Sequence, residues 1–114
     1  MCTSSELLSD RKFLRRLFAK WEECPKKAEH KIISVCDEEK DHYLLLTIGW
    51  NGYQREHDVF VHVDLHDGLF WIEADQTPDG FALDLEAEGV PKNRIVLAFK
   101  HPEQQRFYEY AQAV

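Results

Sequence analysis

The dipeptide Asp67-Gly68 constrains this chain more than any other feature, because it stands between two runs of alternating apolar and polar residues. Asp-Gly tolerates the positive φ angles of a tight two-residue turn. The alternation from Val59 to Asp75 is typical of two half-buried strands. The sequence therefore predicts a β-hairpin over 59–75. Counting outward from the turn gives the pairs His66–Leu69, Leu65–Phe70, Asp64–Trp71, Val63–Ile72, His62–Glu73 and Val61–Ala74.

The two faces of this hairpin differ in composition, since successive side chains of a strand point to opposite faces. One face is apolar and predicts a core: Val61, Val63, Leu65, Phe70, Ile72 and Ala74. The other mixes aromatic rings, imidazoles and carboxylates: Phe60, His62, Asp64, His66, Leu69, Trp71, Glu73 and Asp75. This mixture is unusual for a purely solvated face, so a functional site is expected here first.

The other elements predict an α+β fold in a single domain, 1–114. Strands are expected at 30–37, 42–50 and 53–65, with a hairpin turn at Asn51-Gly52 and a bulge in the long third strand. With 69–75 they form a four-stranded antiparallel meander, and 94–99 adds a fifth strand. Helices are expected to pack on the sheet near 4–24, 78–88 and 103–112, the second with Thr77 as its N-cap. The core is predicted to contain Val63, Leu65, Ile72, Leu46 and Phe99.

The cellular setting is predicted from what the chain lacks. No apolar run approaches the roughly 18 residues that span a bilayer. The first ten residues lack the basic and apolar regions of a signal peptide, so a cytoplasmic protein is expected. Cys2, Cys24 and Cys36 are odd in number and form no Cys-x-x-Cys pair, which favours reduced thiols.

Charge is unevenly distributed along the chain, whose formal net charge is −7. Residues 1–40 carry nine Lys or Arg and eight Asp or Glu, whereas residues 41–114 carry five and thirteen. An acidic body repels phosphate, which disfavours direct nucleic-acid contact by this chain alone. A basic face of the first helix is the candidate for such contact: Arg11, Arg15, Arg16 and Lys20.

The sequence contains one candidate set of residues for metal binding and one for catalysis. His62, Asp64 and His66 alternate along one strand, and alternate residues lie about 6.6 Å apart, so two of them can share an ion. Asp41-His42-Tyr43 could hold a general base, but no nucleophile elbow, P-loop or dinucleotide motif accompanies it. The expectation is a protein without a catalytic centre, cofactor or metal, with His62, Asp64 and His66 as the weak metal candidate.

A protein-contact surface is the favoured interpretation of the polar hairpin face. Aromatic anchors surrounded by polar groups are typical of interface centres. The partner-binding candidates are Phe60, His62, Asp64, Trp71, Glu73 and Asp75. The C-terminal aromatics Phe107, Tyr108 and Tyr110 offer a second surface, and self-association into a homo-oligomer stays open.

An ordered set of short motifs resembles the XisI family. It comprises Asp41-His42-Tyr43, Gly49-Trp50-Asn51-Gly52, Arg55, His62-Val63-Asp64, Asp67-Gly68, Trp71-Ile72, Asp75, Thr77, Gly89-Val90-Pro91-Lys92, Ile95-Val96-Leu97-Ala98-Phe99 and Pro102. The resemblance implies a small cyanobacterial α+β protein and a controlling role in excision of a DNA element. It also implies a XisH-like, nuclease-fold protein as the partner.

Three classes of function follow. The leading one is a non-catalytic factor that binds a XisH-like protein. The second is a DNA-binding accessory factor that uses the basic N-terminal helix. The third is a metal-dependent enzyme at His62, Asp64 and His66.

Overall fold

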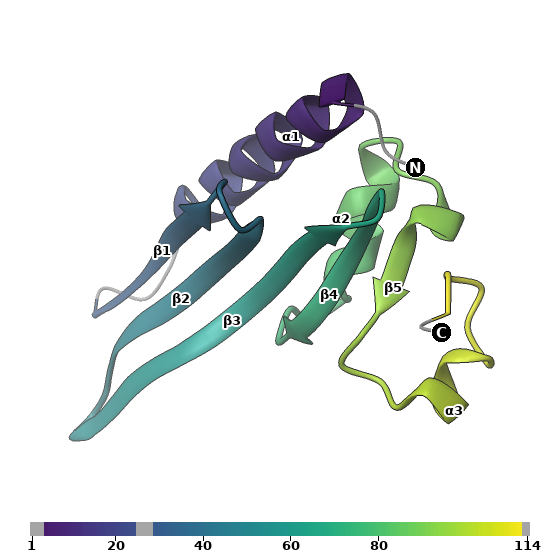
Figure 1. Ribbon diagram of the computed structural model, residues 1–114. Helices are drawn as coiled ribbons and strands as arrows, with labels where there is room; N and C mark the ends of the chain where they lie inside the picture. Colours follow the sequence, from purple (N-terminus) through teal and green to yellow (C-terminus); the bar gives the residue numbers. More distant parts are fainter. Residues whose placement is uncertain (1–3, 25–28, 113–114) are drawn as a thin grey trace.

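The computed structural model describes residues 4–24 and 29–112, which form a five-stranded sheet and three α-helices (Figure 1). Helix α1 (Ser4–Glu22) precedes the strands β1 (His30–Asp37), β2 (His42–Asn51), β3 (Gln54–His66) and β4 (Leu69–Asp75). Helix α2 (Phe81–Ala87) and a 3-10 turn (Lys92–Arg94) lead into β5 (Ile95–Leu97), and α3 (Pro102–Gln105) follows. None of the described helices is both long and apolar enough to cross a membrane.

The sheet keeps the order of the chain, β1-β2-β3-β4-β5. The first four strands are antiparallel, which confirms the predicted meander, and β5 runs parallel to β4. A parallel neighbour requires a crossover, and α2 lies in that connection. The fold is therefore α+β, as predicted.

The turn of the central hairpin has the predicted geometry, since Asp67 has φ 53° and Gly68 has φ 75°. The preceding hairpin turns one residue later than predicted. Asn51 pairs with Gln54, so Gly52 and Tyr53 form the turn, and Gly52 alone among its central residues has a positive φ, 65°. Glycine at the first central position is typical of a type II′ turn.

The first bulge lies in the central hairpin and changes the predicted pairing beyond Val63. The pairs from His66–Leu69 to Val63–Ile72 are confirmed, but His62 then pairs with Ala74, and Val61 pairs with Asp75. Glu73 is the extra residue, so the predicted His62–Glu73 and Val61–Ala74 pairs were wrong. A bulge sets two residues of one strand against one of its neighbour, which shifts every later pair by one position.

The second bulge confirms the one expected in the long strand. Leu46 pairs with Val59 and Leu45 with Val61, which leaves Phe60 as the extra residue of β3. Phe60 packs against Trp21 of α1, with ring centroids 5.4 Å apart. It therefore lies on the helix side of the sheet, and its placement on the polar face with His62 was wrong.

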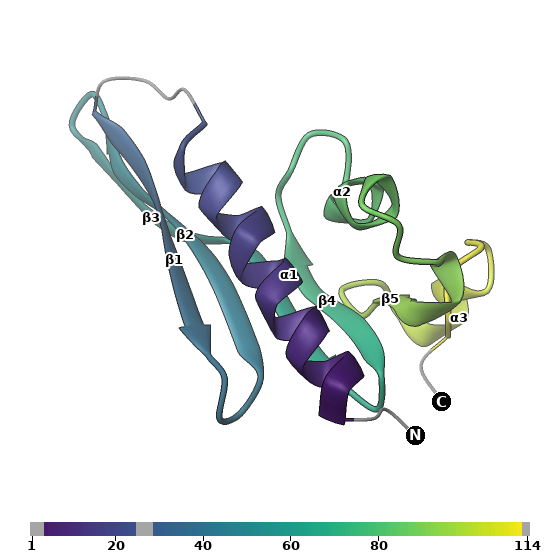
Figure 2. The same ribbon diagram turned by 90° about the horizontal axis from the view of Figure 1, so that it is seen from above.

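One face of the sheet is covered by α1 and α2, which lie on the same side in both views (Figures 1 and 2). Phe18 of α1 meets Phe81 of α2 with ring centroids 5.6 Å apart. Beneath the helices the strands contribute fully buried side chains: Tyr43, Leu45, Val61, Val63, Phe70 and Ile72. We call this the covered face. It confirms Val63, Leu65 and Ile72 as core residues.

No described helix covers the opposite face of β1, β2 and β3 (Figure 1). The register places on it Ile33, Val35, Leu44, Leu46, Ile48 and Val59. Val35 is 45% exposed and Val59 is 37% exposed. We call this the uncovered face. The prediction that Leu46 is core was wrong, because Leu46 lies here and is only partly buried.

The start of α2 is set by Asp75 and not by Thr77. The backbone N–H and the hydroxyl of Thr77 both donate hydrogen bonds to Asp75 Oδ1. The backbone N–H of Phe81 donates to Asp75 Oδ2 at 2.6 Å. The carboxylate thus satisfies the first turn of the helix, so α2 begins at Phe81, after the predicted residue 78.

The C-terminal segment is less helical than predicted. Helix α3 ends at Gln105, whose buried amide donates to the carbonyls of Leu97 and Lys100. Tyr110 donates to Glu86 at 2.6 Å, and burial together with this bond raises the pKa of Tyr110 to about 12. These contacts hold 106–112 against β5 and α2 in place of a longer helix.

Two further predictions near the chain ends concern Phe99 and the cysteines. Phe99 is 42% exposed, so its assignment to the core was wrong; it follows the end of β5 and lies beside Lys100. Cys24 and Cys36 carry free thiols, as predicted, and Cys2 lies outside the described residues.

Candidate functional site

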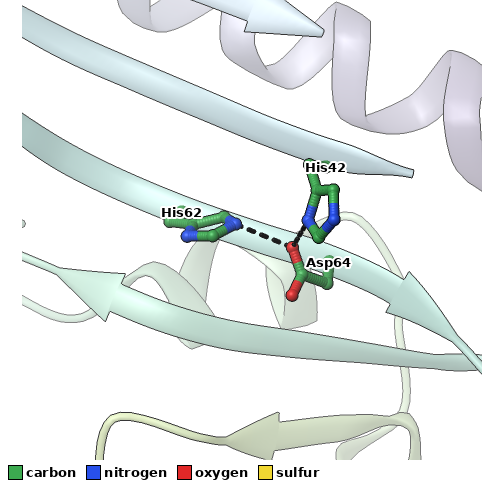
Figure 3. Close-up of side chains that lie close together, drawn as sticks. All are labelled: His42, His62 and Asp64. Carbon is green, nitrogen blue, oxygen red and sulfur yellow. Dashed lines mark hydrogen bonds and ion pairs between the residues drawn. The ribbon is translucent and has the colours of Figure 1, made fainter. Parts of the chain in front are cut away.

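Two imidazoles and one carboxylate converge on the uncovered face (Figure 3). His42 is the first residue of β2, and it pairs directly with Asp64 of β3. His62 lies two residues before Asp64, so both point to the same face. His42 Nδ1 lies 2.5 Å and His62 Nε2 lies 2.7 Å from the same oxygen, Asp64 Oδ1. We call these three residues the histidine–aspartate cluster.

The two histidines of the cluster differ in their surroundings. The His42 side chain is 50% exposed, whereas the His62 side chain is 29% exposed. His62 Nε2 is shielded from solvent and has no well-directed hydrogen bond, despite its short distance from Asp64. Desolvated polar atoms usually have a hydrogen-bond partner, and two other described side-chain atoms, His30 Nδ1 and Glu38 Oε1, share this state.

His66, the third predicted metal ligand, lies apart from the cluster. Its Nε2 is 3.1 Å from the carboxylate of Asp67 in the turn. Its ring lies beside Trp71, with centroids 6.2 Å apart, and its carbonyl accepts a hydrogen bond from Trp71 Nε1. Among the described residues, His42 takes the place in the cluster that the sequence assigned to His66.

The six predicted partner-contact residues do not lie together. His62, Asp64 and Trp71 share the uncovered face, and Trp71 is half-buried. Phe60 and Asp75 lie on the helix side, where one packs on Trp21 and the other caps α2. Glu73 is exposed in the bulge and does not pair with His62.

Asp41 is bound by two neighbouring side chains. Its carboxylate accepts two hydrogen bonds from the Arg11 guanidinium, at 2.7 and 3.0 Å, and one from the Tyr43 hydroxyl at 3.1 Å. Arg11 therefore lowers the pKa of the Asp41 carboxyl below its ordinary value. This network holds α1 to the strand that begins with His42, the neighbour of Asp41.

The basic residues of α1 are largely engaged within the chain. Arg11 binds Asp41, Arg15 lies 2.8 Å from Glu38, and Lys20 lies 2.9 Å from Glu88. Arg16 lies over the Phe13 ring. A phosphate backbone would have to compete with carboxylates for three of the four predicted nucleic-acid contacts.

The sequence missed His42 as a member of the cluster because it gave neither the turn at Gly52-Tyr53 nor the position of the bulge at Phe60. Counted without a bulge from the Asn51–Gln54 pair, His42 falls opposite Val63, on the covered face. The bulge shifts the pairing by one residue and brings His42 opposite Asp64. The one signal available was the composition of both strands, since each carries a histidine or aspartate near its end.

The comparisons with known proteins agree with this fold. A crystal structure of a XisI-like protein from Anabaena variabilis matches with a TM-score of 0.82 and 25% identity, covering 94% of this chain and 99% of that one. The fdxN element excision controlling factor XisI from the same organism matches with a TM-score of 0.68 and 27% identity, covering 95% and 99%.

Curated proteins offer no significant match to this sequence. The family model of the XisI protein, however, matches residues 5–112, which is nearly the whole chain. This match agrees with the resemblance drawn from the ordered motifs. The chain belongs to the XisI protein family.

Proposed function

We propose that this chain is a non-catalytic controlling factor for excision of a DNA element, and that it acts in the cytoplasm by binding a protein partner on its uncovered face. The observation that carries the proposal is the exposure of this face. Val35, Val59 and Trp50 are 45%, 37% and 46% exposed on a sheet whose other side carries the fully buried Tyr43, Leu45 and Val61. Contiguous exposed apolar surface on a small protein is typical of interaction sites.

The composition of the uncovered face suits a protein contact. Trp71 lies opposite Asp64 and beside His66, and its ring centroid is 6.2 Å from that of His66. Half-buried tryptophan amid polar groups resembles the centre of an interface, where aromatic anchors dominate the binding energy. The charge of −7 would draw a basic partner toward it.

The partner that we propose is a XisH-like protein. One similar structure is an fdxN element excision controlling factor, and the family resemblance implies a XisH-like partner. Contact with DNA would then belong to the partner, since Arg11, Arg15 and Lys20 are already paired with carboxylates.

Co-expression tests the proposal. The chain and a XisH-like protein encoded beside it are expected to co-purify through affinity and size-exclusion steps. The salt concentration is set high enough to dissociate complexes that are held together by charge alone. If the two elute separately at micromolar concentration, the proposed partner is wrong.

Trp71→Ala tests the surface. The variant should fold and bind the partner more weakly by about 2 kcal/mol or more, roughly 30-fold in Kd. Leu83→Ala is the matched control, because Leu83 is a 51% exposed apolar residue of α2 on the other side of the molecule. Unchanged binding by folded Trp71→Ala would move the contact elsewhere, first to Phe107 and Tyr108, which are 75% and 42% exposed.

A further inference from the structure

We propose that His42, His62 and Asp64 bind a divalent transition-metal ion on the uncovered face, with zinc as the best match. Two imidazole nitrogens and one carboxylate oxygen are ligand types that zinc accepts, and related ions such as cobalt use the same set. The site would be held by this chain alone, so it does not depend on the proposed partner.

The spacing of the three ligand atoms suits one ion. His42 Nδ1, His62 Nε2 and a carboxylate oxygen of Asp64 all lie within 4.8 Å of one another. Zinc–ligand bonds of about 2.1 Å in a tetrahedron set ligand atoms about 3.4 Å apart. The distances of 2.5 and 2.7 Å to Asp64 Oδ1 are shorter than this, so small side-chain rotations would open room for the ion.

The backbone holds these side chains in place before any ion arrives. His62 and Asp64 come from one central strand, and His42 is fixed opposite Asp64 by the β2–β3 pairing. The Arg11–Asp41 pair anchors the start of β2 from the other side of the sheet. Ligands on paired strands are positioned more accurately than ligands on loops.

The convergence of the three ligand atoms carries the proposal, and the state of His62 agrees with it. Its Nε2 is buried and close to Asp64, yet it has no well-directed hydrogen bond. Bonding to a cation would satisfy this nitrogen together with the carboxylate. Three protein ligands leave at least one coordination position of a tetrahedral ion free, and the His42 side chain is 50% exposed.

Cobalt provides the direct test, because tetrahedral Co²⁺ has visible absorption bands and zinc has none. The full chain is purified without a histidine tag, stripped with a chelator and titrated with CoCl₂. We expect bands that saturate at one equivalent per chain and disappear on addition of one equivalent of ZnCl₂. Absence of thiolate-to-cobalt absorption would separate this site from the cysteines.

Variants locate the site. His62→Ala and Asp64→Asn should each weaken cobalt binding by about tenfold or more, whereas His66→Ala, on the same strand and face, should bind like the wild type. Far-UV circular dichroism checks that each variant is folded. If His62→Ala is unfolded, the result for Asp64→Asn decides the test. The proposal is overturned if the wild type fails to bind one equivalent at submillimolar cobalt, or if folded Asp64→Asn binds as tightly as the wild type.

Discussion

The covered and uncovered faces belong to the same strands but differ in what surrounds them. On the covered face Val61, Val63 and Ile72 have no exposed surface under α1 and α2. On the uncovered face the apolar residues of β1, β2 and β3 remain partly or largely exposed, and the histidine–aspartate cluster lies among them. Strands with apolar side chains on both faces can bury both only if something packs on each face. In the described part of the chain, helices pack on one face alone.

Adjacent residues show the same contrast at a single point. Asp41 is held on the helix side by Arg11 and Tyr43, whereas His42 points to the uncovered face and reaches Asp64. One residue contributes to packing α1 on the sheet, and its neighbour contributes to the candidate site. Substitutions on the two faces should therefore separate stability from binding.

The largest effect is expected at the centre of the covered face. Ile72→Ala removes a fully buried side chain and should lower the free energy of unfolding by about 2–5 kcal/mol, because it leaves a cavity. Urea denaturation measures the change. Leu83→Ala is the control, because it also truncates an apolar side chain to alanine but at an exposed position. A denaturation midpoint equal to that of the wild type would mean that the two faces are assigned the wrong way round.

The pair Asp41 and His42 tests the contrast next. Asp41→Asn should lower the free energy of unfolding by about 1–3 kcal/mol, because it breaks charged hydrogen bonds and leaves Arg11 without its carboxylate partner. His42→Ala should change stability by about 0.5 kcal/mol or less, as at most surface positions. The two variants are compared by urea denaturation and by cobalt titration. Loss of cobalt binding in Asp41→Asn, with His42→Ala unaffected, would contradict the division between the faces.

The position of α2 on the covered face depends on Asp75. Asp75→Ala removes the acceptor for Phe81 N–H and for Thr77, and it should cost about 1–2 kcal/mol. Hydrogen exchange is expected to quicken first in the amides of α2. Asp79→Ala, an exposed acid in the same loop, is the control. Equal protection of α2 in both variants would show that the helix start does not depend on Asp75.

The smallest effect is expected on the uncovered face. Val35→Thr introduces a hydroxyl at a 45% exposed position and should alter stability by about 0.5 kcal/mol or less. The same change at the fully buried Val61 should cost about 1–3 kcal/mol, because the hydroxyl is desolvated. Thermal denaturation of the two variants gives the difference. Similar losses at both positions would mean that the uncovered face is covered in solution, for instance by a second copy of the chain.

Local signals predicted much of the fold. The positive φ angles of Asp67 and Gly68, the four antiparallel strands and the first helix all follow from residues close together in sequence. Helix ends were less predictable. Thr77-Pro78 has the composition of a helix start, yet α2 begins at Phe81 because the carboxylate of Asp75 bonds its first turn.

The candidate site was predicted only in part. His62 and Asp64 follow from strand alternation, but His66 was chosen by the same alternation and lies against Asp67 and Trp71 instead. His42 was not chosen, because its position opposite Asp64 depends on the exact turn, Gly52-Tyr53, and on the bulge lying at Phe60. Alternation within one strand identifies residues that share a face, but it does not give the register to the next strand.

The sequence alone determined the α+β class, the meander and the turn at Asp67-Gly68, because turn chemistry and alternation act over a few residues. The tertiary structure decided which face is covered and where the strands shift register. Phe60 leaves the polar face to pack on Trp21, a residue 39 positions earlier, and this shift moves His42 opposite Asp64. Such a choice depends on contacts between distant segments, so no local pattern encodes it.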